Sequence, residues 1–137
     1  MDDYLTEQAI RDEAEFQQLL KALSKIDSLR PTWTATSEVK VQKYEDKSHD
    51  GIFCSLTFTA NDGVTVYLFN QPCHTTCMVR IYKGETTIYQ ANLKYGRSYE
   101  RLRDYIEAIA NPILQYQEEE NRKRLAHEES VRKDFWN

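Results

Sequence analysis

Four consecutive segments within residues 52–93 alternate between two kinds of side chain at every second position. A period of two is typical of β-strands, because successive side chains of a strand point to opposite faces of its sheet. Short polar stretches separate the segments, and residues 61–63 (Asn-Asp-Gly) and 83–85 (Lys-Gly-Glu) contain the glycine that tight turns favour. The spacing therefore predicts a meander of four antiparallel strands on which the rest of the chain must pack.

The alternation gives the predicted sheet two unlike faces. One face is aliphatic and is formed by Ile52, Cys54, Leu56, Phe58, Val64, Val66, Leu68, Cys77, Val79 and Ile81. The other face carries Thr, Tyr, Phe, Met and Arg side chains, including Tyr67, Phe69, Arg80 and Tyr82. In the last segment the pattern does not decide which set of side chains, that of Tyr89 or that of Ile88, belongs to the core.

Three further segments complete the predicted fold. Residues 32–44 alternate in the same way and predict an edge strand before the meander, with residues 45–51 as a polar connection. Apolar residues at helical spacing predict amphipathic helices over residues 5–28 and from residue 98 onward. Pro112 should kink the second helix or restart it with Asn111 as a new cap. The predicted fold class is α+β, with a five-stranded antiparallel meander sheet flanked by an N-terminal helix and a long C-terminal helix (α-β5-α).

Two packing arrangements satisfy this pattern. Five strands make a sheet about 19–24 Å wide, and helices pack about 8–10 Å apart, so both helices fit side by side on the aliphatic face. The face with the aromatic residues would then stay open. The alternative arrangement places one helix on each face, because the second face is not purely polar.

The last twenty residues have a different character from the rest. Acidic residues precede basic ones by four positions in the pairs Glu118–Arg122, Glu119–Lys123, Glu120–Arg124, Glu128–Arg132 and Glu129–Lys133. Such pairs stabilise a helix that has little to pack against. We therefore expect a single domain over residues 1–117 and a charged helical extension over residues 118–137.

Composition limits the function. The net charge is −4, and binding to duplex nucleic acid needs a basic surface, so the composition argues against that function. No apolar run approaches the ~20 residues that cross a bilayer, and the acidic N-terminus does not look like a secretory signal. Three cysteines is an odd number, which favours reduced thiols in a cytoplasmic protein over a disulfide framework.

Histidine and cysteine residues offer two weak sites for chemistry. Residues 45–50 contain Glu45, Asp46, His49 and Asp50, but their spacing matches no metal-binding loop. Cys73, His74 and Cys77 allow a zinc-like spacing but supply too few ligands, and adjacent Cys73 and His74 would point apart in an extended segment. We therefore expect no metal, no cofactor and no catalytic residue.

The aromatic face is the best functional lead. It predicts a non-enzymatic protein-interaction module, such as an inhibitor, adaptor or subunit of a virus or mobile element, that binds another protein or a second copy of itself. The projecting C-terminal helix could share in this binding. The alternatives are a single-stranded nucleic-acid binder that stacks bases on the same face and a small enzyme that uses Cys or His chemistry. The predicted partner-binding residues are Tyr67, Phe69, Arg80, Tyr82, Tyr89 and Lys40.

Overall fold

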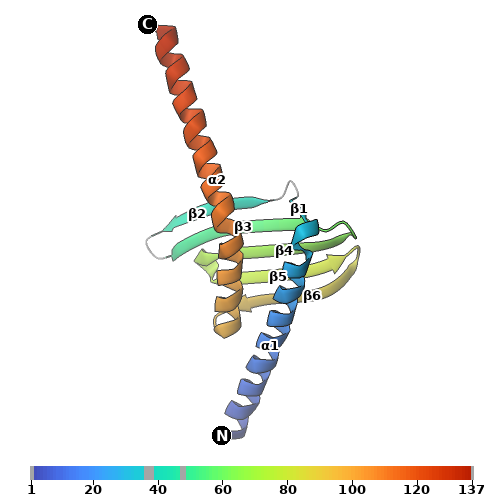
Figure 1. Ribbon diagram of the computed structural model, residues 1–137. Coiled ribbons are helices and arrows are strands. Elements are labelled where there is room, and N and C mark those ends of the chain that lie inside the picture. Colours follow the sequence, from blue (N-terminus) through green and yellow to red (C-terminus); the bar gives the residue numbers. More distant parts are fainter. Residues whose placement is uncertain (1, 36–38, 47–48, 137) are drawn as a thin grey trace.

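The computed structural model describes residues 2–35, 39–46 and 49–136 (Figure 1). Two long helices, α1 (Asp2–Leu29) and α2 (Arg97–Trp136), flank the sheet in the sequence. The strands are β1 (Thr34–Ala35), β2 (Lys40–Asp46), β3 (His49–Thr59), β4 (Val64–Gln71), β5 (Thr76–Lys83) and β6 (Thr86–Lys94). Two short 3-10 helices, η1 (Arg30–Thr32) and η2 (Pro72–His74), lie after α1 and between β4 and β5.

All strand pairs are antiparallel, in the order β1-β3-β4-β5-β6, and β2 also pairs with β3. The predicted strand over residues 32–44 is therefore observed as two strands, both on the same side of β3. β1 pairs with the end of β3 at Phe58 and Thr59, whereas β2 pairs with its first seven residues. The sheet is thus five strands wide, and the predicted α+β fold with an antiparallel meander is confirmed.

The prediction of a polar connection over residues 45–51 is wrong at its ends. β2 continues through Asp46 and β3 begins at His49, so only residues 47 and 48, which lie outside the described residues, separate the two strands. The two strands pair directly with each other, so the sequence that reads as a polar connection forms part of a strand pair.

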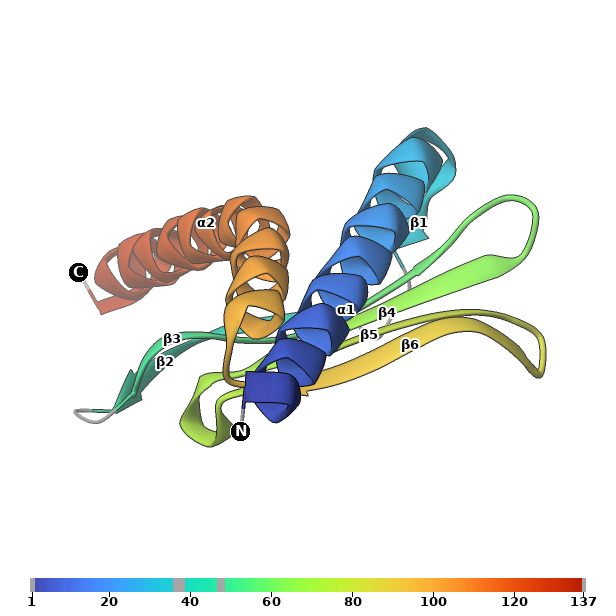
Figure 2. The same cartoon turned by 90° about the horizontal axis from the view of Figure 1, so that it is seen from below.

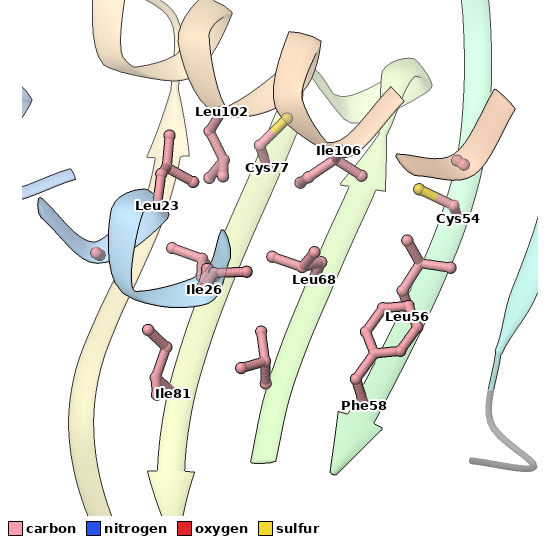
Figure 3. Packing of buried hydrophobic residues seen from close by; sticks show 14 of the residues in the cluster. Leu23, Ile26, Cys54, Leu56, Phe58, Leu68, Cys77, Ile81, Leu102 and Ile106 are labelled. Atoms are coloured by element: carbon pink, nitrogen blue, oxygen red, sulfur yellow. The ribbon is translucent and has the colours of Figure 1, made fainter. Parts of the chain in front are cut away.

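Both helices cover the same face of the sheet, as Figure 2 shows. The core forms between that face and the helices, and its fully buried residues include Leu19 and Ile26 of α1, Leu56 of β3, Leu68 of β4 and Leu102 of α2 (Figure 3). The aliphatic face of the sheet is therefore the covered face. The arrangement with one helix on each face is wrong. The sheet has an aliphatic surface on one side only, and both helices pack against that side.

Only the second half of α1 packs on the sheet. Leu19, Ala22, Leu23 and Ile26 are buried, whereas residues 6–15 are all exposed, including Ala9, which belongs to the stripe of apolar residues at helical spacing in residues 5–28. Figure 1 shows the first half of the helix extending past β6. The stripe thus continues beyond the point at which the sheet ends.

The helix α2 is continuous through Pro112, so the predicted restart at Asn111 is wrong. Figure 2 shows that the helix changes direction between its packed first part and its projecting second part, as expected for a proline inside a helix. Residues 115–136 are all exposed.

Candidate functional site

The face of the sheet away from the helices, which we call the open face, is built by the alternate residues of β3, β4 and β5. Strand register aligns them in rows. One row contains Lys40, Ser55, Phe69, Met78 and Asn92, which are successive partners across five strands. The next row contains Thr57, Tyr67, Arg80 and Gln90, and the third contains Thr65, Tyr82 and Thr87. Side chains in adjacent rows are close enough to form one continuous surface.

Aromatic rings occupy the centre of the open face. Phe69 meets Phe53 edge to face, with ring centroids 5.8 Å apart, and it stacks with Tyr67 at 6.3 Å. The Ser55 hydroxyl donates a hydrogen bond to the Tyr67 hydroxyl at 3.4 Å. All four side chains are half-buried. Their mutual contacts therefore hold the rings in place while leaving part of each ring exposed.

Arg80 and Tyr82 extend this surface along β5. The Arg80 guanidinium lies 4.7 Å from the centre of the Tyr82 ring, and its Nη2 donates a hydrogen bond to Thr87 Oγ1 at 3.5 Å. A cation over an aromatic ring is attracted to its negative face. The exposed guanidinium is thus oriented by a neighbouring ring and keeps donors available to a ligand.

The open face is weakly basic, although the chain is acidic overall. Lys40, Arg80 and Lys94 lie at its register positions, and no carboxylate does among the positions of this face whose side chains the structure describes. A surface of this kind favours a ligand that combines apolar or aromatic groups with negative charge.

Five of the six predicted partner-binding residues share this face, and one does not. Tyr89 pairs with fully buried Ile81 and packs against the core on the helix-covered face. Burial, and to a lesser degree the nearby Glu15 carboxylate, raises the pKa of the Tyr89 hydroxyl. A register irregularity between Ile81 and Tyr82 makes the orientation of β6 hard to predict, because a bulge shifts the alternation by one residue.

Phe53 and Met78 belong to the open face but are missing from the predicted binding residues. Met78 is the direct partner of Phe69, and Phe53 contacts the same ring from β3. The alternation alone places both side chains on the correct face. Their contact with Phe69 depends on the register between strands. Predicting that register requires the lengths and types of the turns that join the strands.

A buried polar cluster lies on the opposite, covered face. Asn70 is fully buried between β3 and β5, where its Nδ2 donates hydrogen bonds to the Ile52 carbonyl at 2.9 Å and to Glu107 Oε1 at 3.3 Å. The Cys77 thiol donates to Asn70 Oδ1 at 3.1 Å. These bonds join three strands and α2, so the cluster has a structural role in fixing the helix on the sheet.

The thiols of Cys54 and Cys77 are unsuited to nucleophilic chemistry. Both side chains are fully buried and point toward α2 (Figure 3). Burial raises the pKa of each thiol to about 12, with smaller contributions from nearby charges. A thiol with so high a pKa is protonated at neutral pH, and the thiolate is the reactive form.

The other predicted sites for chemistry gain no support. His74 is exposed at the end of η2. The side chains of Cys73 and of Glu45, Asp46, His49 and Asp50 lie outside the described part of the structure. Among the residues described, no three His, Cys, Asp or Glu side chains come together in a metal-binding group.

No protein-family model, no curated protein and no solved structure matches the chain. Within the described residues, neither of the long helices is apolar enough over a sufficient length to cross a bilayer. The open face is the feature of the molecule that best indicates a function.

Proposed function

We propose that this protein is a non-enzymatic protein-interaction module, such as a small inhibitor, adaptor or subunit, that binds its partner through the open face of the sheet. One observation carries the proposal: both helices lie on the other face, so Phe53, Tyr67, Phe69, Arg80 and Tyr82 form one uncovered surface (Figure 2). Contiguous aromatic surface of this kind is unusual on a domain that functions without a ligand.

The residue types of the open face suit a binding site. Tyr and Arg are enriched among the residues that contribute most to protein–protein affinity. Here the ring contacts and the Arg80–Tyr82 pair already restrict the side chains, which reduces the conformational entropy lost on binding. The excess of Lys and Arg on this face favours a partner with apolar groups surrounded by carboxylates.

Single-stranded nucleic acid is the second candidate ligand, and the same geometry supports it. Bases stack on exposed aromatic rings, while cations contact the phosphates. Tyr67 and Phe69 supply half-exposed rings, and Lys40 and Arg80 supply the cations. The two ligands differ in salt dependence, because phosphate contacts release counterions and weaken steeply as salt is added.

Affinity capture from nuclease-treated extract of the source cells tests the proposal. The bait proteins are the wild type, an open-face variant (Tyr67→Ala with Tyr82→Ala) and a matched control (Tyr95→Ala with Tyr116→Ala). The control removes two exposed tyrosines that lie outside the open face. We expect partner proteins that the wild type and the control retain and the open-face variant loses.

Two outcomes would contradict the proposal. Equal retention by all three baits would show that the partner binds elsewhere. Capture of no protein from the nuclease-treated extract, with salt-dependent binding of an oligo(dT) probe that the open-face variant lacks, would assign the face to nucleic acid instead.

A further inference from the structure

The second half of α2 is a helix that nothing in the domain covers. Residues 118–136, which we call the tail helix, continue α2 away from the sheet (Figure 1), and every one of them is exposed. Ion pairs within the helix, such as Arg122–Glu119 and Lys133–Glu129, help it to stay folded. In proteins, however, most helical stability comes from the packing of an apolar face.

Large apolar side chains are concentrated at the end of this helix. Leu125 is 51% exposed, Val131 52%, Phe135 79% and Trp136 78%. At 100° per residue, Val131 and Phe135 continue the stripe by which Leu102, Ile106 and Ala110 of the same helix pack on the sheet, and Leu125 lies about 60° beyond the edge of that stripe. The packing face of α2 thus extends past the domain and ends at the exposed Phe135, beside the exposed Trp136.

The pattern of apolar and charged residues along the tail helix indicates which kind of partner fits it. Leu125, Glu128, Arg132 and Phe135 follow one another at spacings of three, four and three residues, which is the spacing of the facing positions in a coiled coil. When the series is paired with a second copy running in the opposite direction, each apolar residue meets an apolar residue and each charged residue meets one of opposite charge. In an antiparallel pair, the first residue meets the last and the second meets the third.

We propose that the tail helices of two copies of this protein pair in antiparallel orientation about a two-fold axis at the level of Ser130. Leu125 of each copy packs against Phe135 of the other, and Glu128 of each copy forms an ion pair with Arg132 of the other. The two Val131 side chains meet on one flank of this pair. The charged layers specify the register, as polar residues in such seams do.

The proposed pairing is sterically open. The tail helix projects clear of the sheet (Figure 1), and each domain begins near residue 115. In this register, that point lies about nine helical positions, or about 14 Å, beyond Trp136 of the other copy. The two domains therefore sit at opposite ends of an elongated dimer, with both open faces free.

The contact is small. Two apolar layers and two charged layers are fewer than those of a stable coiled coil, so we expect a dimer that forms at high micromolar concentration. Its affinity should respond strongly to charge reversal, because a like-charged pair within the seam replaces each ion pair.

Charge reversal tests the pairing by sedimentation velocity on the full chain. Glu128→Arg and Arg132→Glu should each weaken self-association by about tenfold or more. An equimolar mixture of these two variants should associate at least as well as the wild type, because every charged layer then pairs Arg with Glu. Circular dichroism checks that helix content is unchanged.

The mixture separates pairing between copies from effects within one helix, since mixing cannot repair a helix that a single substitution has weakened. Association of the mixture but of neither variant alone would support the proposal. A wild type that remains monomeric at about 1 mM, single variants that dimerise normally, or a mixture that stays monomeric would each overturn it. Dimerisation abolished by Tyr67→Ala with Tyr82→Ala, but not by charge reversal, would assign self-association to the open face instead.

Discussion

Leu68 and Phe69 are neighbours in β4, but their surroundings have little in common. Leu68 is fully buried between the sheet and the helices, whereas Phe69 lies half-exposed among Phe53, Tyr67 and Met78 on the open face. The same contrast repeats along β5 and along β3, except at Thr57, which is buried although it lies in a row of the open face. One set of strands thus carries two separate surfaces. The covered face stabilises the fold, and the fold does not require the side chains of the open face.

The largest effect should come from the covered face. Leu68→Ala removes a fully buried side chain next to both helices, and it should lower the free energy of unfolding by about 3–5 kcal/mol. Urea denaturation followed by circular dichroism measures the change. A loss below about 1 kcal/mol would mean that the core is not where the structure places it.

Asn70→Ala should have the next largest effect. The substitution leaves the Ile52 carbonyl and the Cys77 thiol without their buried partner, which should reduce stability by about 2–3 kcal/mol. The matched control is Asn92→Ala, an exposed asparagine of β6 on the open face. Equal, small losses for both variants would show that the buried cluster does not fix α2 on the sheet.

Alkaline pH should weaken the covered face. Burial raises the pKa of Cys54 and Cys77 to about 12 and that of Tyr105 to about 12, so the unfolded chain releases these protons at lower pH than the folded chain. Stability should therefore be constant below about pH 8 and fall as the pH rises further, by about 2 kcal/mol at pH 9.5. Urea titrations across this range, with Cys77→Ala expected to reduce the slope, provide the measurement. A stability that rises above pH 9 would contradict the burial of the thiols.

Removal of the tail helix should have the smallest effect on stability. A chain that ends at Gln117 loses only exposed residues, so its Tm at low protein concentration should change by less than about 4 °C. Thermal unfolding at a few micromolar measures this without a contribution from self-association. A drop of more than ~8 °C would show that Leu125, Val131 or Trp136 docks on the domain.

Local patterns predict most of this fold. Alternation in residues 52–82 assigns the side chains in this range to the correct faces of β3, β4 and β5, and helical spacing predicts both helices, although the apolar stripe of α1 continues past its packed part. Relationships between segments are harder to predict. The division of residues 32–44 into β1 and β2 depends on two separate pairings with β3, and the orientation of Tyr89 depends on the irregularity at Ile81 and Tyr82.

In the candidate site, too, local patterns are predictable and contacts between strands are not. Tyr67, Phe69, Arg80 and Tyr82 share a face because strand geometry requires it, and their exposure depends on where the helices pack. The aliphatic composition of the other face makes that placement predictable. The contacts of Phe53 and Met78 with Phe69 depend on the register between strands. The alternation within a single strand gives no information on that register.

The free energy of unfolding of the Tyr67→Ala, Tyr82→Ala double variant tests most directly whether the open face is a separate surface. If it is, the variant remains folded and loses only about 1–3 kcal/mol, since both side chains are half-buried on a sheet surface. Urea denaturation beside the wild type and Leu68→Ala gives the value. A loss of about 6 kcal/mol or more, or a variant that is unfolded in buffer, would show that the aromatic residues belong to the core, because truncation of each buried aromatic residue costs about 3–5 kcal/mol.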